Sequence, residues 1–268
     1  IRDRDMDAPH LTLEDGQNIQ ASLTIGADGR NSKTRELAGI SAKTKQYDQS
    51  AITCIINHSR AHDNVSSEFH RPGGPLALVP MQGNQSSIVW VEKTARANEI
   101  IKLKKSDFTA ALQSAMNDIL GGITLETNPE MWPLSTVKAQ SLTAPHIALI
   151  AEAAHVMSPI TAQGLNLSLR DVAALAETIV DAMRVGLAPG NASILNFYEK
   201  RRRLDINTRT FGVDKMNWVV SNDIPAIKEL RRAGFKAMSA LPPLKRFATA
   251  HGLAPSIDQS RLAKGLPL

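Results

Sequence analysis

Two segments, far apart in the chain, share one local design that restricts what this chain can fold into. In each, a short apolar strand runs into a turn of small residues that carries a carboxylate, and a helix follows. Asp28 supplies the carboxylate of the first turn and Glu152 that of the second. Small residues let backbone approach a ligand closely, and a helix N-terminus offers free N–H groups with partial positive charge. The segments, residues 25–35 and 150–166, are therefore predicted to present polar groups to a ligand at the carboxyl ends of two strands.

The remainder of the chain is predicted to mix strands and helices. A hairpin is expected over residues 11–21, because apolar residues alternate around the turn dipeptide Asp15-Gly16. Amphipathic spacing predicts helices farther along, and the tail after Gly252 is expected to be loose. The fold class is thus α/β, or α+β mixed. Strands are predicted at 51–56, 76–79, 87–91, 136–142 and 146–150, and helices at 105–120, 165–184, 192–220 and 225–239.

Composition limits the classes of function. Aromatic residues make up only 4% of the chain, too few for the stacking platforms that grip single-stranded nucleic acid. The one cysteine, Cys54, cannot form an intramolecular disulfide, which favours a reducing compartment. No signal-like leader and no uninterrupted apolar run of roughly 20 residues is present. We expect a cytoplasmic protein that is soluble or, at most, peripheral on the inner membrane.

Positive charge gathers toward the C-terminus. The net charge is +5, yet residues 196–268 hold 14 Lys/Arg against 6 Asp/Glu. A solvated helix face is the favoured interpretation, with an anionic membrane, an acidic partner or nucleic acid as alternatives. Nucleic-acid binding is not expected, because Glu199 and Asp205 flank the arginines at 201–203. An apolar cluster in the same region favours buried packing over docking at a membrane interface; it comprises Phe211, Val213, Met216, Trp218, Val219 and Val220.

The motifs in their order resemble a known family. The first turn matches the Asp-Gly-x-x-Ser-x-x-Arg pattern of the para-hydroxybenzoate hydroxylase-like flavoprotein monooxygenases, through Asp28, Gly29, Ser32 and Arg35. Within that superfamily the chain is most similar to the ubiquinone-biosynthesis hydroxylases, and the resemblance runs from about residue 11 to about residue 203. The second turn matches the extended Gly-Asp motif through Ala153, Ala154, His155, Pro159, Gln163, Gly164, Asn166 and Asp171.

This resemblance implies a cofactor, an electron donor and a reaction. FAD would be the cofactor, NAD(P)H the electron donor, and an electron-rich phenol the ring that is hydroxylated with O₂. Asp28, Gly29 and Arg35 would serve the flavin and the pyridine nucleotide, and Glu152 stands where the family's carboxylate bonds the ribityl chain. The catalytic candidates are Pro159, beside the flavin ring, and His155. Backbone N–H groups would stabilise negative charge on the flavin; they lie around Gln163, Gly164, Leu165 and Asn166.

The resemblance also implies which segments of the chain bind the substrate and which bind the cofactor. Its substrate would be an apolar polyprenylated phenol, bound on the sheet between Ala51 and Val91. A ubiquinone-biosynthesis complex or peripheral membrane contact is the implied partner. The implied segments are a partial FAD-binding domain at 1–45, a substrate-binding β-sheet domain at 46–142, the rest of the FAD-binding domain at 143–190 and a helical region at 191–268.

Three departures from the family pattern bear on flavin binding. The Gly-x-Gly-x-x-Gly loop that cradles the FAD pyrophosphate is absent, as expected for a chain truncated at its N-terminus. Ala151-Glu152 replaces Gly-Asp, and Ala162 replaces a glycine. If that glycine adopts positive φ, alanine costs on the order of 1 kcal/mol. We therefore expect the isolated chain to bind FAD weakly or not at all.

A second function, from a different class, remains open. The departures favour a non-catalytic accessory protein, derived from the same family, that holds a lipid or a quinone precursor. The intact Asp28 motif and the stretch from Gln163 to Asn166 favour the hydroxylase.

Overall fold

The computed structural model describes residues 3–4, 10–159, 162–221, 225–243, 245–246 and 259–268. The chain forms two compact units, and each is considered by itself. Unit 1 comprises Ile1–Lys45, Ser135–Asp214 and Ala237–Leu268, and unit 2 comprises Gln46–Leu134 and Lys215–Lys236. The four functional segments expected from the sequence stay a prediction.

Unit 1 is built around a pair of parallel strands. Strand β4 (Thr24–Gly26) pairs in parallel with β12 (Ile147–Leu149), and β11 (Thr143–Ala144) adds an antiparallel edge. Gly26 lies opposite Leu149, and a Cβ on Gly26 would come within 2.7 Å of Leu149 Cδ2. Glycine is needed there for the strands to approach. Because the strands are parallel, the two carboxylate turns leave the sheet at the same edge.

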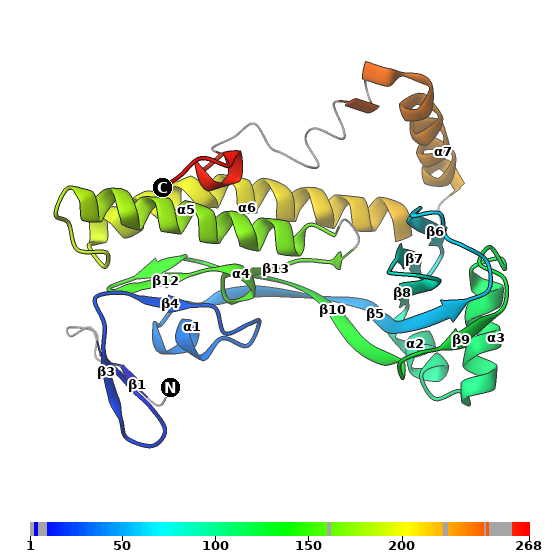
Figure 1. The fold of residues 1–268 in the computed structure, drawn as a ribbon, viewed down its shortest axis with the longest axis horizontal. Helices are drawn as coiled ribbons and strands as arrows, with labels where there is room; N and C mark the ends of the chain where they lie inside the picture. The colour runs from blue at the N-terminus through cyan, green and yellow to red at the C-terminus, as the bar shows by residue number, and fades with distance from the viewer. Residues whose placement is uncertain (1–2, 5–9, 160–161, 222–224, 244, 247–258) are drawn as a thin grey trace. The chain divides into compact units, whose positions relative to one another are not determined.

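Helices cover both faces of this small sheet (Figure 1). Helix α5 (Gly164–Arg184) and the neighbouring helix α6 (Ala192–Ser221) lie side by side on one face, and α1 (Lys33–Leu37) lies on the other. Tyr198 of α6 is fully buried and donates its hydroxyl to the carbonyl of Leu149 at 2.9 Å. Burial of this apolar core fixes α5 and α6 against β12. The core includes Ala148, Leu149, Leu167, Ala174, Leu175, Leu195, Tyr198 and Ile206.

The N-terminal hairpin is confirmed. Strand β2 (His10–Thr12) pairs antiparallel with β3 (Asn18–Gln20), and β1 (Asp3–Arg4) pairs with β2. Gly16 has φ of 85° in the connecting turn, which is a conformation that glycine adopts without strain.

Unit 2 is an antiparallel sheet with helices on one face. Its strands follow the order β5 (Ala42–His58), β8 (Gln85–Glu92), β7 (Gly74–Pro80), β6 (Ser67–Arg71), and β9 (Ile123–Leu125) also pairs with β5. Helices α2 (Thr94–Ile100) and α3 (Lys105–Ala115) contribute Ile100, Phe108 and Leu112 to the core. Ile52, Cys54 and Ile56 of β5 belong to that core, so the residues between them face the opposite side of the sheet.

Residues 130–139 and 151–156 form two further strands and a short helix. Strand β10 (Glu130–Ala139) pairs antiparallel with β13 (His155–Val156) in unit 1, and the short helix α4 (Ala151–Ala154) lies between β12 and β13. The predicted strand at 136–142 therefore begins earlier and ends at Ala139. The predicted strands at 51–56, 76–79 and 87–91 are confirmed within β5, β7 and β8.

The long helices form as predicted, and one shorter helix ends earlier than predicted. The long helices are confirmed, and the third of them, α7, covers Pro225–Ala240. The helix expected at 105–120 ends at Ala115 because Asn117 and Asp118 have φ near 50°.

The prediction that the tail after Gly252 is loose needs correction. Residues 252–258 lie outside the described residues, but the end of the chain is docked on α5: Arg261 Nη2 lies 2.5 Å from Asp181 Oδ1, and a 3₁₀ turn (Leu262–Lys264) follows.

Candidate functional site

The first carboxylate turn is held by its own residues. Asp28 Oδ1 accepts the Ser32 hydroxyl at 2.5 Å, and Oδ2 accepts the backbone N–H of Thr34 at 2.9 Å. Ser32 in turn caps α1 by accepting the N–H of Arg35 at 2.9 Å. Partial burial alone would raise the Asp28 pKa, but these hydrogen bonds outweigh it and hold the pKa below its ordinary value. Asp28 is therefore a fixed, ionised acceptor.

Arg35 links the first turn to the second. Its Nη1 donates to the carbonyl of Ala153 in α4 at 2.9 Å, and its Nη2 donates to the carbonyl of Arg30 at 2.9 Å. Arg30 Nε also lies 3.7 Å from the Glu152 carboxylate. The two carboxylate turns, each predicted to lie at the carboxyl end of a strand, therefore lie together, through contacts between residues more than a hundred positions apart in the sequence.

The second turn is strained at the position where alanine replaces glycine. Ala151 has φ of 54°, in the left-handed region that a Cβ disfavours. Its N–H donates to Asp171 Oδ2 of α5 at 3.0 Å. Glu152 is the following residue, and its side chain is 51% exposed and turned toward Arg30. The carboxylate is available to a ligand, but a contact with Arg30 already engages it.

His155 and Pro159, the two predicted catalytic residues, occupy different environments. The His155 ring is buried, and its Nε2 lies 2.6 Å from Asp171 Oδ2. This placement suits a residue that holds the turn in shape. Pro159 is exposed, immediately before residues 160–161, which lie outside the described residues.

The N-terminus of α5 forms the second half of the candidate site. Ala162 has φ of 50°, so the second alanine-for-glycine position also adopts positive φ. Gly164, Leu165 and Asn166 begin the helix and are exposed, with Leu165 71% exposed. Their backbone N–H groups fall in the first turn, where a helix has no intrahelical acceptors for them. The four residues from Gln163 to Asn166 therefore lie where the sequence predicts an anion-stabilising helix end.

The glycines of the two turns leave their backbone open to a ligand. Gly29 has φ of 81°, and a Cβ on either Gly29 or Gly164 would meet no atom within 4 Å. Open backbone at Gly29, next to Asp28, and at Gly164, at the start of α5, is suited to a polar ligand that approaches main-chain groups. The fit is poorer at Ala151 and Glu152, where an added Cβ and a longer side chain stand.

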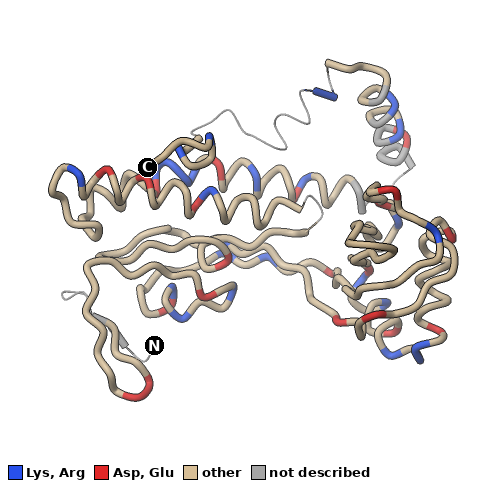
Figure 2. Tube along the Cα trace, viewed as in Figure 1, with Lys and Arg blue, Asp and Glu red and all other residues tan. Residues whose placement is uncertain are grey.

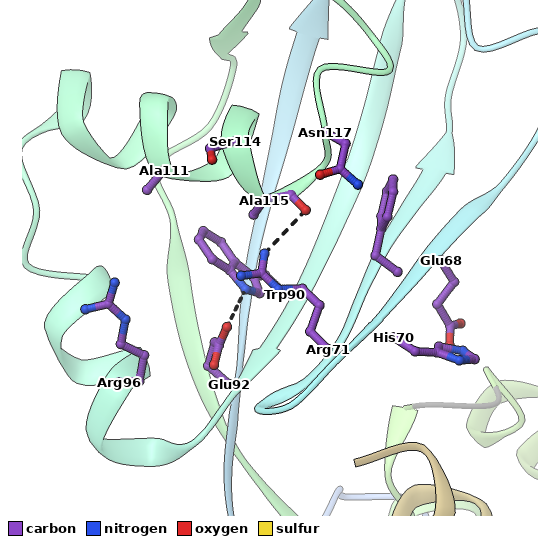
Figure 3. A pocket seen from close by; sticks show the side chains of 11 residues that line it. Glu68, His70, Arg71, Trp90, Glu92, Arg96, Ala111, Ser114, Ala115 and Asn117 are labelled. Atoms are coloured by element: carbon purple, nitrogen blue, oxygen red, sulfur yellow. Dashed lines mark hydrogen bonds and ion pairs between the residues drawn. The ribbon is translucent and has the colours of Figure 1, made fainter. Parts of the chain in front are cut away.

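A cavity of about 650 Å³ lies within unit 2, on the helical side of its sheet (Figure 3). Trp90 donates its indole N–H to Glu92 Oε1 at 3.1 Å, and the Arg71 guanidinium stands 5.7 Å from the Trp90 ring centre. Arg71 also donates to the carbonyl of Ala115 at 3.3 Å, which closes one wall. This cavity cannot be predicted from the sequence, because its lining comes from β6, β8, α2 and α3, which are separate in sequence.

The opposite face of the unit 2 sheet is open and apolar in part, and the sheet between Ala51 and Val91, on which the sequence predicts that a phenol binds, includes this face. Val79 and Trp132 are 43% and 52% exposed there, and Ile55 and Val89 are half-buried. The described residues contain no group of three His, Cys, Asp or Glu suited to a metal ion. Cys54 is buried, and burial raises the pKa of its thiol to about 12, which leaves it un-ionised near neutral pH.

The fold and the paired turns define an FAD-binding class of protein, and comparison with known families agrees. A profile described as the FAD binding domain matches residues 2–209, and the chain belongs to this family. It is 39% identical over 269 residues to the ubiquinone hydroxylase UbiL of Rhodospirillum rubrum, covering 99% of this chain and 62% of that protein. It is 32% identical over 247 residues to the 3-demethoxyubiquinol 3-hydroxylase of Escherichia coli, covering 92% of this chain and 63% of that protein. The chain thus spans less than two thirds of these relatives.

Solved structures agree on the fold. The p-nitrophenol 4-monooxygenase PnpA of Pseudomonas putida superimposes with a TM-score of 0.76 at 15% identity, over 94% of this chain and 65% of that one. The anhydrotetracycline hydroxylase OxyS of Streptomyces rimosus superimposes with a TM-score of 0.71 at 19% identity, over 95% of this chain and 51% of that one. The predicted fold class is thereby confirmed, as is the predicted resemblance to flavin-dependent aromatic hydroxylases.

Proposed function

We propose that this chain is part of an FAD-dependent monooxygenase that hydroxylates a polyprenylated phenol in ubiquinone biosynthesis. The observation that carries the proposal is the convergence of the Asp28 turn and the Glu152 turn through Arg35. The names of the similar hydroxylases support ubiquinone precursors as the substrate class. NAD(P)H is proposed as the electron donor on the family resemblance alone.

The residues would divide the work of holding the flavin. Asp28, kept ionised by Ser32 and Thr34, would accept hydrogen bonds from hydroxyl groups of the cofactor or the pyridine nucleotide. The N–H groups of Gly164, Leu165 and Asn166 would stabilise negative charge on its ring. Glu152 would reach the ribityl chain after leaving Arg30, and Pro159 would line the ring. The flavin, when bound, supplies the oxygen chemistry that hydroxylates the phenol.

The substrate would lie on the unit 2 sheet face that carries Ile55, Val79 and Val89. That face is apolar and part-exposed, as binding of a polyprenyl chain requires. Replacement of Val79 by Asp should weaken the binding of a polyprenylated phenol and leave flavin binding unchanged. Loss of flavin binding in that variant would contradict the assignment of Val79 to substrate binding alone.

A titration of the chain with FAD, followed by flavin absorbance and fluorescence, tests the proposal. We expect weak, saturable binding, because the pyrophosphate cradle is absent from this sequence and Ala151 and Ala162 stand at glycine positions. Asp28→Ala should abolish it, and Glu36→Ala, on the exposed side of α1, should not. Purified protein that carries stoichiometric yellow flavin would contradict the expectation of weak binding.

A non-catalytic accessory protein is the second candidate, and it is favoured by the same two alanines and by the Arg30–Glu152 contact. Such a protein would bind a quinone precursor on the unit 2 sheet without binding flavin. Saturable binding of a polyprenylated phenol together with no FAD binding at any concentration would decide for it.

Peripheral membrane contact is proposed for α6. No described helix is long and apolar enough to cross a bilayer. The apolar cluster at 211–220 was expected to be buried, which is correct for Val213 but wrong for three of its members: Phe211, Met216 and Trp218 are 64%, 47% and 56% exposed. Basic residues accompany them along α6 (Figure 2). An exposed aromatic beside positive charge suits an anionic membrane surface, and Trp218→Asp should abolish co-sedimentation with anionic liposomes.

Nucleic-acid binding gains no support from the arginines at 201–203. Each is engaged within unit 1: Arg201 with Glu177, Arg202 with Asp171 and Asp205, and Arg203 with Glu199. This agrees with the neutralisation that the sequence predicts.

A further inference from the structure

A set of mostly buried polar side chains reaches from α6 to Ala151, the start of a segment that contains α4 and β13 and ends at Gln163, here called the cofactor loop. Asp171, fully buried on α5, uses Oδ2 for the Ala151 N–H and for His155. Its other oxygen, Oδ1, accepts a hydrogen bond from Arg202 Nε at 2.8 Å. Arg202 comes from α6 and is 3% exposed. The position of Ala151 therefore depends on a residue that lies outside both sequence motifs.

The same set continues to the end of the loop. Arg202 Nη1 donates to Asp205 Oδ2 at 2.8 Å, and Arg209 Nε donates to Asp205 Oδ1 at 2.8 Å. Arg209 Nη1 then donates to Gln163 Oε1 at 2.9 Å, directly before α5. Asp171, Arg202, Asp205, Arg209 and Gln163, here called the polar network, thus connect the two ends of the loop through α6.

The acidic and basic side chains of the network pair with one another in the interior of unit 1. Burial alone would lower the pKa of Arg202, but Asp171 and Asp205 outweigh it and raise that pKa above its ordinary value. Burial would likewise raise the pKa of Asp205, whereas the hydrogen bonds from Arg202 and Arg209 hold it below its ordinary value. These shifts favour the ionised forms of Arg202 and Asp205, so removal of either one leaves an uncompensated charge in the interior.

Strain in the loop gives the network a role beyond packing. Ala151 and Ala162 both hold left-handed backbone, and strained residues persist only where the surroundings over-determine them. Within the network, Asp171 accepts the N–H of Ala151, and Arg209 donates to Gln163, the neighbour of Ala162. At the first turn, hydrogen bonds within the turn hold the backbone of residues 28–35, through Asp28 and Ser32.

We propose that Arg202 and Arg209 of α6, acting through Asp171 and Gln163, are positioning residues that hold both ends of the cofactor loop in the shape that receives flavin. The inference rests on the proposed function, because it assigns the loop to the flavin. It also gives α6 a part in cofactor binding, which the sequence motifs alone place only in the Asp28 and Glu152 segments.

Hydrogen–deuterium exchange of the full chain, combined with an FAD titration, tests this role. In Arg209→Gln we expect exchange in residues 151–166 to rise about tenfold and FAD affinity to fall about tenfold. Arg209→Lys, which keeps one charged donor, should recover part of both. Arg203→Gln is the matched control: it removes an ion-paired arginine of the same helix that bonds Glu199 and the carbonyl of Gln140, away from the loop.

The possible outcomes distinguish the positioning role of Arg202 and Arg209 from the proposed function of the chain. Arg202→Met should show the larger effect, and Arg209→Gln carries the test if Arg202→Met does not fold, since Arg209 lies at the edge of the network with its side chain 12% exposed. Unchanged loop exchange in Arg209→Gln, or an equal rise in Arg203→Gln, would overturn the positioning role. A wild-type chain without saturable FAD binding, whose loop still loses protection in Arg209→Gln, would reduce the network to a structural tie and overturn its role in flavin binding. That result would not by itself refute the proposed function, which allows weak or no FAD binding by this chain alone.

Discussion

The two carboxylate turns follow parallel neighbouring strands, yet their shapes are maintained in different ways. In the first, Asp28 bonds Ser32 and Thr34, a few residues away, and glycine occupies the left-handed position. In the second, alanines occupy both left-handed positions, and Asp171 and Arg209 supply the restraint from α5 and α6. A turn whose residues match their backbone carries its own shape. A turn whose residues do not match must have its shape imposed by distant parts of the chain.

The largest effect is expected when the restraint that α5 places on the second turn is removed. Asp171→Ala should lower the free energy of unfolding by about 3–5 kcal/mol, because it leaves Arg202 as an uncompensated buried charge. Urea denaturation followed by circular dichroism measures it. A loss of less than about 1 kcal/mol would show that the second turn holds its shape without Asp171.

Removal of the local restraint in the first turn should cost less. Asp28→Ala removes the acceptor for the Thr34 N–H at the start of α1, and we expect a loss of about 1 kcal/mol. The same denaturation experiment applies. Glu36→Ala, an exposed position on the same helix, should change stability by under about 0.5 kcal/mol. Equal losses in the two variants would contradict a specific role for Asp28.

Restoring glycine at the strained positions should sharpen the contrast. Ala162→Gly and Ala151→Gly should each stabilise the chain by about 1 kcal/mol, because the relief of left-handed strain exceeds the entropy that glycine adds to the unfolded state. Both should also tighten FAD binding. Ala176→Gly, within α5, is the control and should destabilise by about 1 kcal/mol. Destabilisation by Ala162→Gly would argue against strain there.

The smallest expected effect is a dependence on pH in the first turn. The folded-state pKa of Asp28 lies below its ordinary value of 3.8, so its ionised form favours folding. Its contribution is complete above about pH 4 and is lost as pH falls through the folded pKa. The stability difference between wild type and Asp28→Asn, measured by thermal melts from pH 6 to about pH 2.5, should shrink toward acid. A difference that is constant with pH would contradict the pKa shift.

Much of the fold and part of the site can be predicted from the sequence. The Asp28 turn is predictable because its contacts are local, and the long helices because their apolar spacing is regular. The family pattern includes both turns, but it does not predict the hydrogen bond from Arg35 to the carbonyl of Ala153. The polar network escapes sequence reasoning, since Arg202 and Arg209 look like members of a solvated basic face until α6 packs on α5. The docked C-terminal tail escapes it for the same reason.

Hydrogen–deuterium exchange of the wild-type chain with and without FAD, at concentrations up to about 1 mM, tests the central claim most directly. The account predicts that flavin protects residues 28–35 and residues 162–167 together, because one ligand contacts both turns. Protection of only one of these segments, or protection confined to the cavity lined by Arg71 and Trp90, would contradict it.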